Sequence, residues 1–368
     1  AERMAQKMSI YAQAKHGIVY ATDTPPENYF GWPSVAILAD DTIVAGCSGP
    51  RRFHLCPWGK SSVFYSKDGE NFSAPQIVHD DLIDNRDLGV VAMGGQKFAV
   101  TWFSLDLRTW GLEKRLDSQS AADAVAYMAT WKDDTVKGLM GSWLKITSDG
   151  GKSWTRPIRV PVSAPHGFIC LRNGELGYLG KGYDETLNAP AGMVRFAVSE
   201  DGGFTWTVRG DVGVPEGETM DSYHEPHVIE LKDGTLMGAI RYHVPQERGG
   251  GVDVCLTFSQ DGGRHWTLPE RMNIDGTPPH LLRHSSGAIV LSYGYRNPGY
   301  GQRARVSYDE GRTWSEDIVI RDDGESGDLG YPCSIELRDG SIFTVYYQAL
   351  PGRKNTSILW SRWMLPER

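Results

Sequence analysis

Two short motifs recur along this chain, and their repetition constrains the fold more than any other feature. The first motif is an apolar run, a tight turn and a second apolar run, as in FICLRNGELGYL (168–179) and SIELRDGSIFTVYY (334–347). An Asp-Gly or Asn-Gly turn between two apolar runs is a strong signal for a β-hairpin. Clear copies at 35–46, 228–240 and 281–293 and a weaker one at 90–102 bring the predicted hairpins to six.

The second motif carries an aspartate and a tryptophan, as in FSQDGGRHW at 258–266. Variants of it stand at 65–72, 146–154, 198–206 and 306–314. Each of the first five hairpins is followed by a third apolar run that leads into this motif, and a fourth run follows the motif. Six repeats of four antiparallel strands predict an all-β chain folded as a six-bladed β-propeller. The last repeat lacks a fourth strand, so we expect GIVYA (17–21) at the N-terminus to close the ring.

The spacing of the strands predicts one propeller domain over residues 1–368. Its regularity is interrupted in the second repeat, where an insertion at 105–141 separates strands two and three. The segment SAADAVAYMATW within this insertion has the composition of a helix.

The aspartate motif itself has a structural interpretation. Aspartate binds backbone N–H groups in tight turns, glycine adopts positive φ, and tryptophan fills the space between neighbouring sheets. One catalytic centre does not need five copies of its acid. We therefore expect the motif to stabilise the scaffold.

Composition excludes several classes of partner and site. The net charge of −8 and the absence of basic runs argue against nucleic acid, and no apolar run is long enough to span a membrane. No pattern indicates a cofactor or a metal, and Cys47 and Cys56 are more simply unpaired than bridged. The stretch AERMAQKMSIYAQ lacks the apolar core of a secretory signal. We expect a soluble chain of unknown oligomeric state; secretion or a periplasmic location, with the signal already removed, stays open.

The order of strands separates the two faces of the predicted propeller. The aspartate motifs and the hairpin turns lie on one face, while the starts of the first strands and the loops between strands two and three lie on the other. The loops of this second face are rich in Arg, His, Tyr and Asp. A ring of titratable residues at one mouth of a propeller is a good candidate for a site.

With its aspartate boxes between strands three and four, the chain resembles the sialidase (neuraminidase) superfamily over nearly its whole length. This resemblance implies a glycosidase that uses a tyrosine nucleophile, an assisting glutamate, an acid/base aspartate and three arginines on a substrate carboxylate. In DLGYPCSIEL, Tyr331 stands at the position that resembles the nucleophile, and in HEPHVIEL, Glu225 resembles its partner. A carboxylate that takes the phenolic proton makes a tyrosine usable as a nucleophile.

Arg241 and Arg303 resemble the second and third arginines of this set, and Arg296 competes with Arg303. A planar guanidinium suits a carboxylate because it binds both oxygens. The first arginine is missing, because Gly31 and Trp32 stand before Pro33 where the superfamily has an Arg-Ile-Pro type of motif. Arg51 or Arg52 could reach in from the next loop.

The loop that should carry the acid/base aspartate, RRFHLCPWGK (51–60), has no carboxylate, so His54 is its available titratable group. Asp87 and Asp184 are the other acid candidates.

Three histidines at the starts of first strands, His166, His227 and His280, form a further departure from the superfamily. Histidine can serve in acid/base chemistry near neutral pH, whereas no metal-binding spacing is present.

Three functions are compatible with these residues. The leading hypothesis is an exo-acting, sialidase-like glycoside hydrolase that removes a terminal, acidic sugar from an oligosaccharide or polysaccharide. The second is a lyase acting on uronate-containing polysaccharides with a His/Tyr pair, which the histidine-rich mouth suits. The third is a propeller that binds glycans without turnover, which the missing acid/base aspartate suggests.

Overall fold

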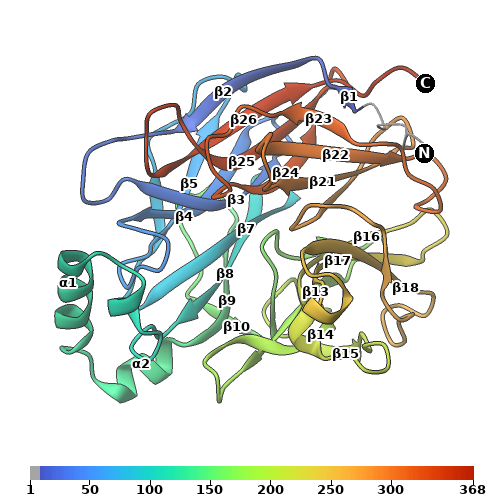
Figure 1. Ribbon diagram of the computed structural model, residues 1–368. Coiled ribbons are helices and arrows are strands. Elements are labelled where there is room, and N and C mark those ends of the chain that lie inside the picture. The colour runs from blue at the N-terminus through green and yellow to red at the C-terminus, as the bar shows by residue number, and fades with distance from the viewer. Residues whose placement is uncertain (1–8) are drawn as a thin grey trace.

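The computed structural model describes residues 9–368, whose strands form the six sheets of a β-propeller (Figure 1). Each sheet is built on four strands that are antiparallel neighbours. Blade 1 contains β3 (Tyr29–Ile37), β4 (Ile43–Arg51), β5 (Ser61–Ser66) and β6 (Gln76–His79). Blade 2 contains β7 (Asp84–Gly94), β8 (Lys97–Leu105), β9 (Gly141–Thr147) and β10 (Ile158–Val160). In blade 3 the first strand is split into β11 (Val162–Ser163) and β12 (Ile169–Cys170), followed by β13 (Leu176–Asp184), β14 (Ala189–Ser199) and β15 (Thr207–Asp211).

The remaining blades complete the predicted ring. Blade 4 contains β16 (Tyr223–Glu230), β17 (Leu236–His243), β18 (Val252–Ser259) and β19 (Glu270–Arg271). Blade 5 contains β20 (His280–Arg283), β21 (Ile289–Tyr295), β22 (Gly301–Ser307) and β23 (Ile318–Arg321). Blade 6 contains β24 (Gly330–Glu336), β25 (Ile342–Ala349), β26 (Thr356–Trp363) and the N-terminal β2 (Ala14–Tyr20). The fold class predicted from the repeats is confirmed.

The N-terminus closes the ring as expected, and it does more than the sequence indicated. Strand β2 pairs antiparallel with β26, so the last blade acquires its fourth strand from the start of the chain. The short β1 (Ile10–Tyr11) continues past this closure and pairs in parallel with β23 of blade 5. The N-terminal stretch in which we looked for a secretory signal falls largely on residues 1–8, outside the described residues.

The insertion in blade 2 contains the predicted helix, α1 (Ser118–Met128), with the 3₁₀ turn η1 (Leu112–Lys114) before it and α2 (Asp133–Leu139) after it. Asp117 caps α1 by accepting a hydrogen bond from the backbone N–H of Ser120. The buried faces of these elements form one apolar cluster with Ile83 and Leu105 of blade 2. The helices therefore pack beside β8 and β9, at the lower left of Figure 1.

The aspartate motifs are turn structures, as their composition indicated. In blade 4, the Asp261 carboxylate accepts hydrogen bonds from the backbone N–H groups of Arg264 and His265 and from the hydroxyl of Ser259. The Trp266 indole N–H donates to the carbonyl of Gly263, and its ring packs 5.6 Å from the ring of Phe196 in blade 3. Because all the donors come from the motif's own turn, the aspartate is occupied in holding that turn.

Between neighbouring blades the sheets bury apolar side chains, which form clusters such as that of Val35, Phe64, Phe343 and Trp360 between blades 1 and 6. All five cysteines are free, so Cys47 and Cys56 are not bridged. Within residues 9–368, no helix is long and apolar enough to cross a membrane.

Candidate active site

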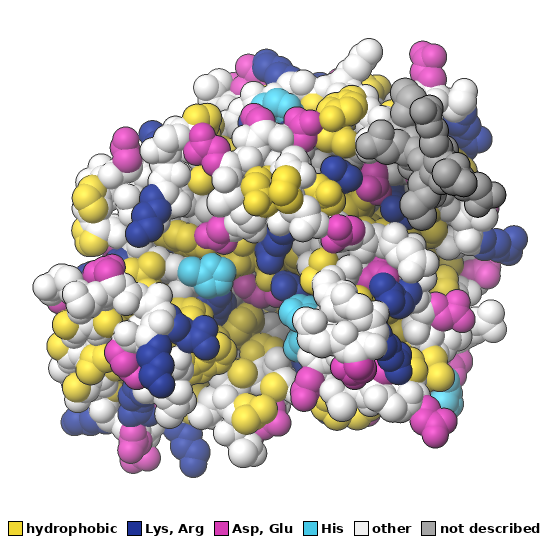
Figure 2. Space-filling view, viewed as in Figure 1, with side chains coloured by type: hydrophobic (Ala, Val, Ile, Leu, Met, Phe, Trp, Pro, Cys, Tyr) yellow, Lys and Arg dark blue, Asp and Glu magenta, His cyan; other side chains and the backbone are white. Residues whose placement is uncertain are grey.

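A cavity of about 540 Å³ opens at the mouth where the first strands begin and where the loops between strands two and three meet. Figure 2 shows this hollow near the centre of the face, with basic, acidic and histidine side chains around it. Its lining includes Trp32, Asp87, Ala164, Glu225 and Tyr331 at or beside the starts of first strands. The aspartate motifs lie at the other ends of the strands. The face predicted from strand order therefore holds this cavity.

On the floor of the cavity, four blades each place one residue in the same unusual backbone conformation. Trp32, Asp87, Glu225 and Tyr331 have φ values of 50°, 56°, 44° and 52°, a region that side chains other than glycine rarely adopt. Each lies within an irregularity in the pairing of its blade's first two strands. Such a bulge re-aims a side chain, at a backbone cost of roughly 1–3 kcal/mol per residue. Strain repeated in four blades and directed into one cavity makes this cavity the candidate functional site.

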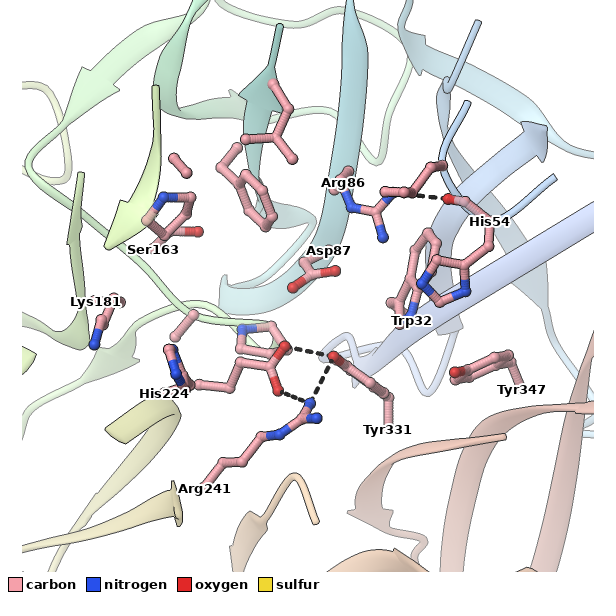
Figure 3. Close-up of a pocket in the computed structure, with 18 of the residues that line it drawn as sticks. Trp32, His54, Arg86, Asp87, Ser163, Lys181, His224, Arg241, Tyr331 and Tyr347 are labelled. Carbon is pink, nitrogen blue, oxygen red and sulfur yellow. Dashed lines mark hydrogen bonds and ion pairs between the residues drawn. The ribbon is translucent and has the colours of Figure 1, made fainter. Parts of the chain in front are cut away.

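Tyr331 and Glu225, one hundred and six residues apart in sequence, meet on this floor. The Tyr331 hydroxyl donates a short hydrogen bond to one oxygen of the Glu225 carboxylate. Nη1 of Arg241 lies 2.6 Å from the other Glu225 oxygen and 3.2 Å from the Tyr331 hydroxyl (Figure 3). Nε of Arg241 donates to Nε2 of His243 at 2.9 Å. Among the described residues nothing accepts a hydrogen bond from Nη2 of Arg241, which leaves that nitrogen for a ligand.

The electrostatics assign complementary protonation states to this pair. Burial, followed by the charges of Glu225 and Asp87, raises the pKa of the Tyr331 hydroxyl well above its usual value. Burial alone would also raise the pKa of the Glu225 carboxyl, but the Arg241 guanidinium and the Tyr331 hydrogen bond outweigh it and hold that pKa below the usual value. At neutral pH the tyrosine therefore keeps its proton and the glutamate is ionised, ready to accept that proton.

Arg296, and not Arg303, reaches the cavity. Its Nε donates to the carbonyl of Leu329 at 3.0 Å, and its guanidinium carbon lies 5.9 Å from the centre of the Tyr331 ring. The guanidinium of Arg303 instead binds Asp317 at 3.1 Å and covers the ring of Tyr295 at 3.5 Å. Successive side chains of β22 point to opposite faces of the sheet. The Arg303 side chain is on the face that carries Asp317, so it binds this carboxylate and does not enter the cavity.

This difference gives a direct test of the two competing arginines. We expect Arg296→Met to raise KM for an anionic glycoside by roughly tenfold or more, since a charge-assisted hydrogen bond contributes about 1.5–3 kcal/mol. Arg303→Met should leave KM within about twofold, because Arg303 binds only protein groups. Steady-state kinetics of both variants measure this, and the reverse order of effects would assign the site to Arg303.

Arg51 and Arg52 do not supply the missing first arginine. Arg51 is fully buried and pairs with Asp84 at 2.7 Å, while Arg52 stacks on Trp58 at 3.7 Å. The arginine that lines the cavity on this side is Arg86, whose guanidinium carbon lies 4.1 Å from the centre of the Trp32 ring. The sequence held a signal for it, because Arg86 directly precedes Asp87 at the start of a first strand.

The three acid candidates take different positions. His54 lines the rim of the cavity beside Trp32, with ring centres 4.8 Å apart (Figure 3). Asp87 lies on the floor, where burial and the Glu225 charge raise the pKa of its carboxyl well above the usual value. Asp184 does not line the cavity; its carboxylate accepts hydrogen bonds from the backbone N–H groups of Thr186 and Leu187 in its own turn.

The three histidines converge, but below the cavity and not inside it. His227 stands two residues after Glu225, and the ring centres of His166, His227 and His280 lie 4.4 to 5.9 Å apart. Nδ1 of His227 accepts a hydrogen bond from the N–H of Leu281, and Nδ1 of His280 accepts one from the N–H of Ser334. All three rings are buried, and among residues 9–368 no group of side chains has the arrangement of a metal site.

These buried rings predict a loss of stability in mild acid. Burial lowers the pKa of His227 to about 4 and lowers the pKa values of His166 and His280 as well. The unfolded chain therefore binds protons below pH ~6.5 that the folded chain refuses, so stability is complete above this pH and falls as the pH drops towards 4. For His227 alone, the decrease in unfolding free energy amounts to roughly 3 kcal/mol. Urea unfolding between pH 7 and 4.5 measures it.

The matched variant is His227→Gln, whose amide oxygen can still accept from Leu281 but cannot take a proton. The slope of its unfolding free energy against pH should be smaller than that of the unsubstituted protein, by the equivalent of about one proton bound on unfolding. Equal slopes in both proteins would show that the histidine cluster does not cause the acid sensitivity.

The lining also includes residues that were not among the sequence candidates, among them Lys181, His224, His243 and Tyr347. Lys181 comes from β13, where burial lowers the pKa of its amine to about 8. His224 directly precedes Glu225, and His243 stands two residues after Arg241. In Figure 3, His224 and Lys181 lie across the cavity from His54. His243 could have been found from its alternation with Arg241 along β17, which places both side chains on one face.

The sequence profile of the BNR repeat-like domain matches residues 124–344. The chain belongs to this family. Together with the propeller and its aspartate boxes, this makes it a member of the sialidase superfamily. A related protein described as a sialidase, from Bacteroides fragilis (strain YCH46), is 25% identical over 234 residues. That match covers 56% of this chain and 39% of the relative, so the BNR repeat-like chain spans well under half of the relative's length.

Solved structures of similar chains share the fold. A protein of unknown function from Dyadobacter fermentans DSM 18053 superposes with a TM-score of 0.77 at 23% identity and covers 96% of this chain and 99% of its own. Trypanosoma rangeli sialidase gives a TM-score of 0.64 at 15% identity, and the match covers 96% of this chain and 60% of the sialidase chain. A third structure is the intramolecular trans-sialidase from Ruminococcus gnavus in complex with oseltamivir carboxylate. It gives a TM-score of 0.62 at 13% identity, and the match covers 95% of this chain and 97% of the trans-sialidase chain. At these identities the similarity shows the fold alone.

Proposed function

We propose that this chain is an exo-acting glycoside hydrolase of sialidase type, which removes a terminal sugar that carries a carboxylate. The observation that carries this proposal is the contact of Tyr331, Glu225 and Arg241 on the strained floor of the cavity. A phenol that shares its proton with an ionised carboxylate is an activated nucleophile, and a covalent intermediate divides one difficult step into two easier ones.

The charges of the cavity favour an anionic substrate, although the chain as a whole is acidic. The described lining holds five cationic side chains, from Arg86, Arg115, Lys181, Arg241 and Arg296, against the two carboxyl groups of Asp87 and Glu225. An excess of positive charge in a concave site attracts and orients an anion.

The position of the arginines indicates where the acid group of the sugar lies. Nη1 of Arg241 contacts the Tyr331 hydroxyl, so a carboxylate held by Nη2 lies next to the carbon that Tyr331 attacks. Arg296, whose guanidinium carbon lies 5.9 Å from the centre of the Tyr331 ring, supports the same carboxylate. This favours an ulosonic acid, in which the carboxylate is attached to the anomeric carbon, over a uronic acid. Asp87 and Arg86 are then placed to bind hydroxyl groups of the sugar.

The lyase alternative loses three of the histidines on which it rested. It rested on a histidine-rich mouth, but His166, His227 and His280 are buried below the floor and bind Ser34 and backbone N–H groups. The non-catalytic alternative rested on the missing aspartate, and the rim position of His54 weakens that argument.

A panel of aryl glycosides tests the proposal: the α-glycoside of N-acetylneuraminic acid, a glycoside of a shorter ulosonic acid, a glucuronide and a neutral galactoside. We expect release of the free acidic sugar from one or both ulosonic substrates only. Cleavage of the glucuronide alone would contradict the placement of the carboxylate. A lyase would instead act on a uronate-containing polysaccharide and leave an unsaturated product that absorbs in the near-UV, and binding without turnover would indicate a glycan-binding propeller.

A further inference from the structure

His54 stands in a network that reaches from the rim of the cavity to the loop before β24. Its Nδ1 lies 3.1 Å from the hydroxyl of Tyr29 and 3.7 Å from the Asp328 carboxylate. Tyr29 donates its hydroxyl proton to one oxygen of Asp328 at 2.8 Å, and Tyr347 donates to the other oxygen at 3.0 Å. Asp328 was not among the residues that the sequence singled out.

The hydrogen bonds determine which nitrogen of His54 carries a proton. Tyr29 has one hydroxyl proton, which it gives to Asp328, so its oxygen is left to accept a hydrogen bond from Nδ1–H of His54. In the neutral ring Nε2 is then a free base, and in the protonated ring Nε2–H is a donor. Among residues 9–368 no side chain or backbone group binds this Nε2, and His54 lines the cavity.

The backbone of His54 is fixed as firmly as its ring. Its carbonyl accepts hydrogen bonds from Nη2 of Arg51 at 2.9 Å and from Nη1 of Arg86 at 2.7 Å. Both guanidinium groups are tied to the buried carboxylate of Asp84. The loop thus holds its histidine in one place, which is what a proton-transfer group needs.

We propose that Asp328, through Tyr29, positions His54 as the group that protonates the leaving oxygen and then activates water. This inference rests on the proposed glycosidase function and adds a positioning residue to it. The geometry is that of an imidazole with one nitrogen directed towards a carboxylate and the other directed towards the reacting atoms.

The location of His54 also distinguishes it from Asp87. Asp87 lies on the floor beside Glu225 and Tyr331, whereas the rest of the glycan must leave through the mouth. The side chain of His54 is about half exposed at the rim, with a relative accessibility of 51%. A proton donor for the departing oxygen belongs at the rim.

The proposed steps balance. In the first, Tyr331 forms a bond to the anomeric carbon and passes its proton to Glu225, while the glycosidic C–O bond breaks and the leaving oxygen takes the proton from Nε2 of His54. In the second, water gives a proton to Nε2 and its oxygen bonds to the anomeric carbon. The bond to Tyr331 breaks, and Glu225 returns the proton to the phenolate.

Burial and three charged groups act on the protonation of His54. Burial and the positive charges of Arg86 and Arg51 lower the pKa of the imidazole, while Asp328 and its hydrogen bonding raise it, and the net shift is downward. As the acid, His54 must be protonated, so kcat/KM should fall as the pH rises through this lowered pKa.

Ring-nitrogen NMR of protein labelled with ¹⁵N-histidine tests the positioning without a substrate. The His54→Gln variant identifies the signals. We expect the proton of neutral His54 on Nδ1, and Asp328→Asn should lower the pKa of His54 by about 1 unit or more, as loss of a nearby opposite charge does. The matched control is Asp261→Asn, which removes a carboxylate beside His265 on the opposite face. A proton on Nε2, or an unchanged pKa in Asp328→Asn, would overturn the proposal. The tautomer is read in the unsubstituted protein, so that result does not depend on a variant that folds.

Kinetics then test the chemical role. Asp328→Asn and His54→Gln should lower kcat/KM, which reports the step in which the leaving group departs, by roughly 10²- to 10⁴-fold for a glycoside with a simple alcohol as leaving group. Both substitutions should lower kcat/KM far less for a nitrophenyl glycoside, whose leaving group needs no proton. In Asp328→Asn, the alkaline limb of the pH profile of kcat/KM should move to lower pH. Equal losses with both leaving groups would show a structural role only. If the unsubstituted protein cleaves none of the glycosides, the proposed function fails, while the NMR result still decides whether Asp328 positions His54.

Discussion

Tyr331→Phe is expected to lower kcat by at least about 10³-fold, with little change in the affinity for the sugar. The reason is that the phenolic oxygen forms the bond to the anomeric carbon, and Phe offers no atom to replace it. The ring of Tyr331 is buried and packs near Tyr347, and Phe preserves that packing. Steady-state kinetics, together with calorimetric titration of the product sugar, separate the loss of turnover from a loss of binding.

Tyr293→Phe is the matched control for this substitution. Tyr293 is also a buried tyrosine on a propeller strand whose hydroxyl binds a carboxylate, that of Asp317, but it does not line the cavity. Its removal should reduce stability by about 1 kcal/mol and leave kcat nearly unchanged. Full activity in Tyr331→Phe would rule out Tyr331 as the nucleophile. A slow, activated glycoside should in addition leave a sugar attached to Tyr331 that mass spectrometry detects.

The second large effect is expected from Arg241→Met. This change removes the group that would bind the substrate carboxylate and also leaves Glu225 buried without its cation. Truncating one partner of a buried charge pair costs about 2–5 kcal/mol, so kcat/KM should fall by roughly 30- to 5000-fold. Because Arg241 holds the pKa of Glu225 down, that pKa should rise, and the acidic limb of the pH profile should move to higher pH.

Arg305→Met provides the comparison for this prediction. Arg305 is partly buried and also binds a carboxylate, that of Asp317 at 2.7 Å, but it lies outside the cavity. It should change stability without moving the pH profile. If Arg241→Met affects only stability as well, the arginine is a structural partner of Glu225 and not a ligand for the substrate.

The scaffold could be predicted because it repeats. Each aspartate box makes its contacts within a few residues, as Asp261 does with Ser259 and His265, so its role is visible in any one copy of the motif. Six copies of a hairpin and five boxes then determine the order of strands and hence which loops share a face. Tyr331, Glu225, Arg241 and His54 all line the cavity on the face so identified.

Residues that depend on the direction of a side chain could not be predicted in this way. Arg296 and Arg303 stand seven residues apart on one hairpin, and only the register of β21 and β22 shows that Arg303 turns towards Asp317. Arg51 and Arg86 both pair with the buried Asp84, and only the folded chain shows that Arg86 lines the cavity while Arg51 does not.

The sequence by itself determined the propeller, its closure by the N-terminal strand and the face that carries the site, because these follow from local and periodic patterns. Only the tertiary structure decided which side chains meet. Contacts between blades join residues hundreds of positions apart, such as Tyr29 with Asp328, and no periodicity along the chain encodes them. The same holds for His166, His227 and His280. Their positions at the starts of strands predicted that they line the mouth, whereas in the structure they are buried beneath it.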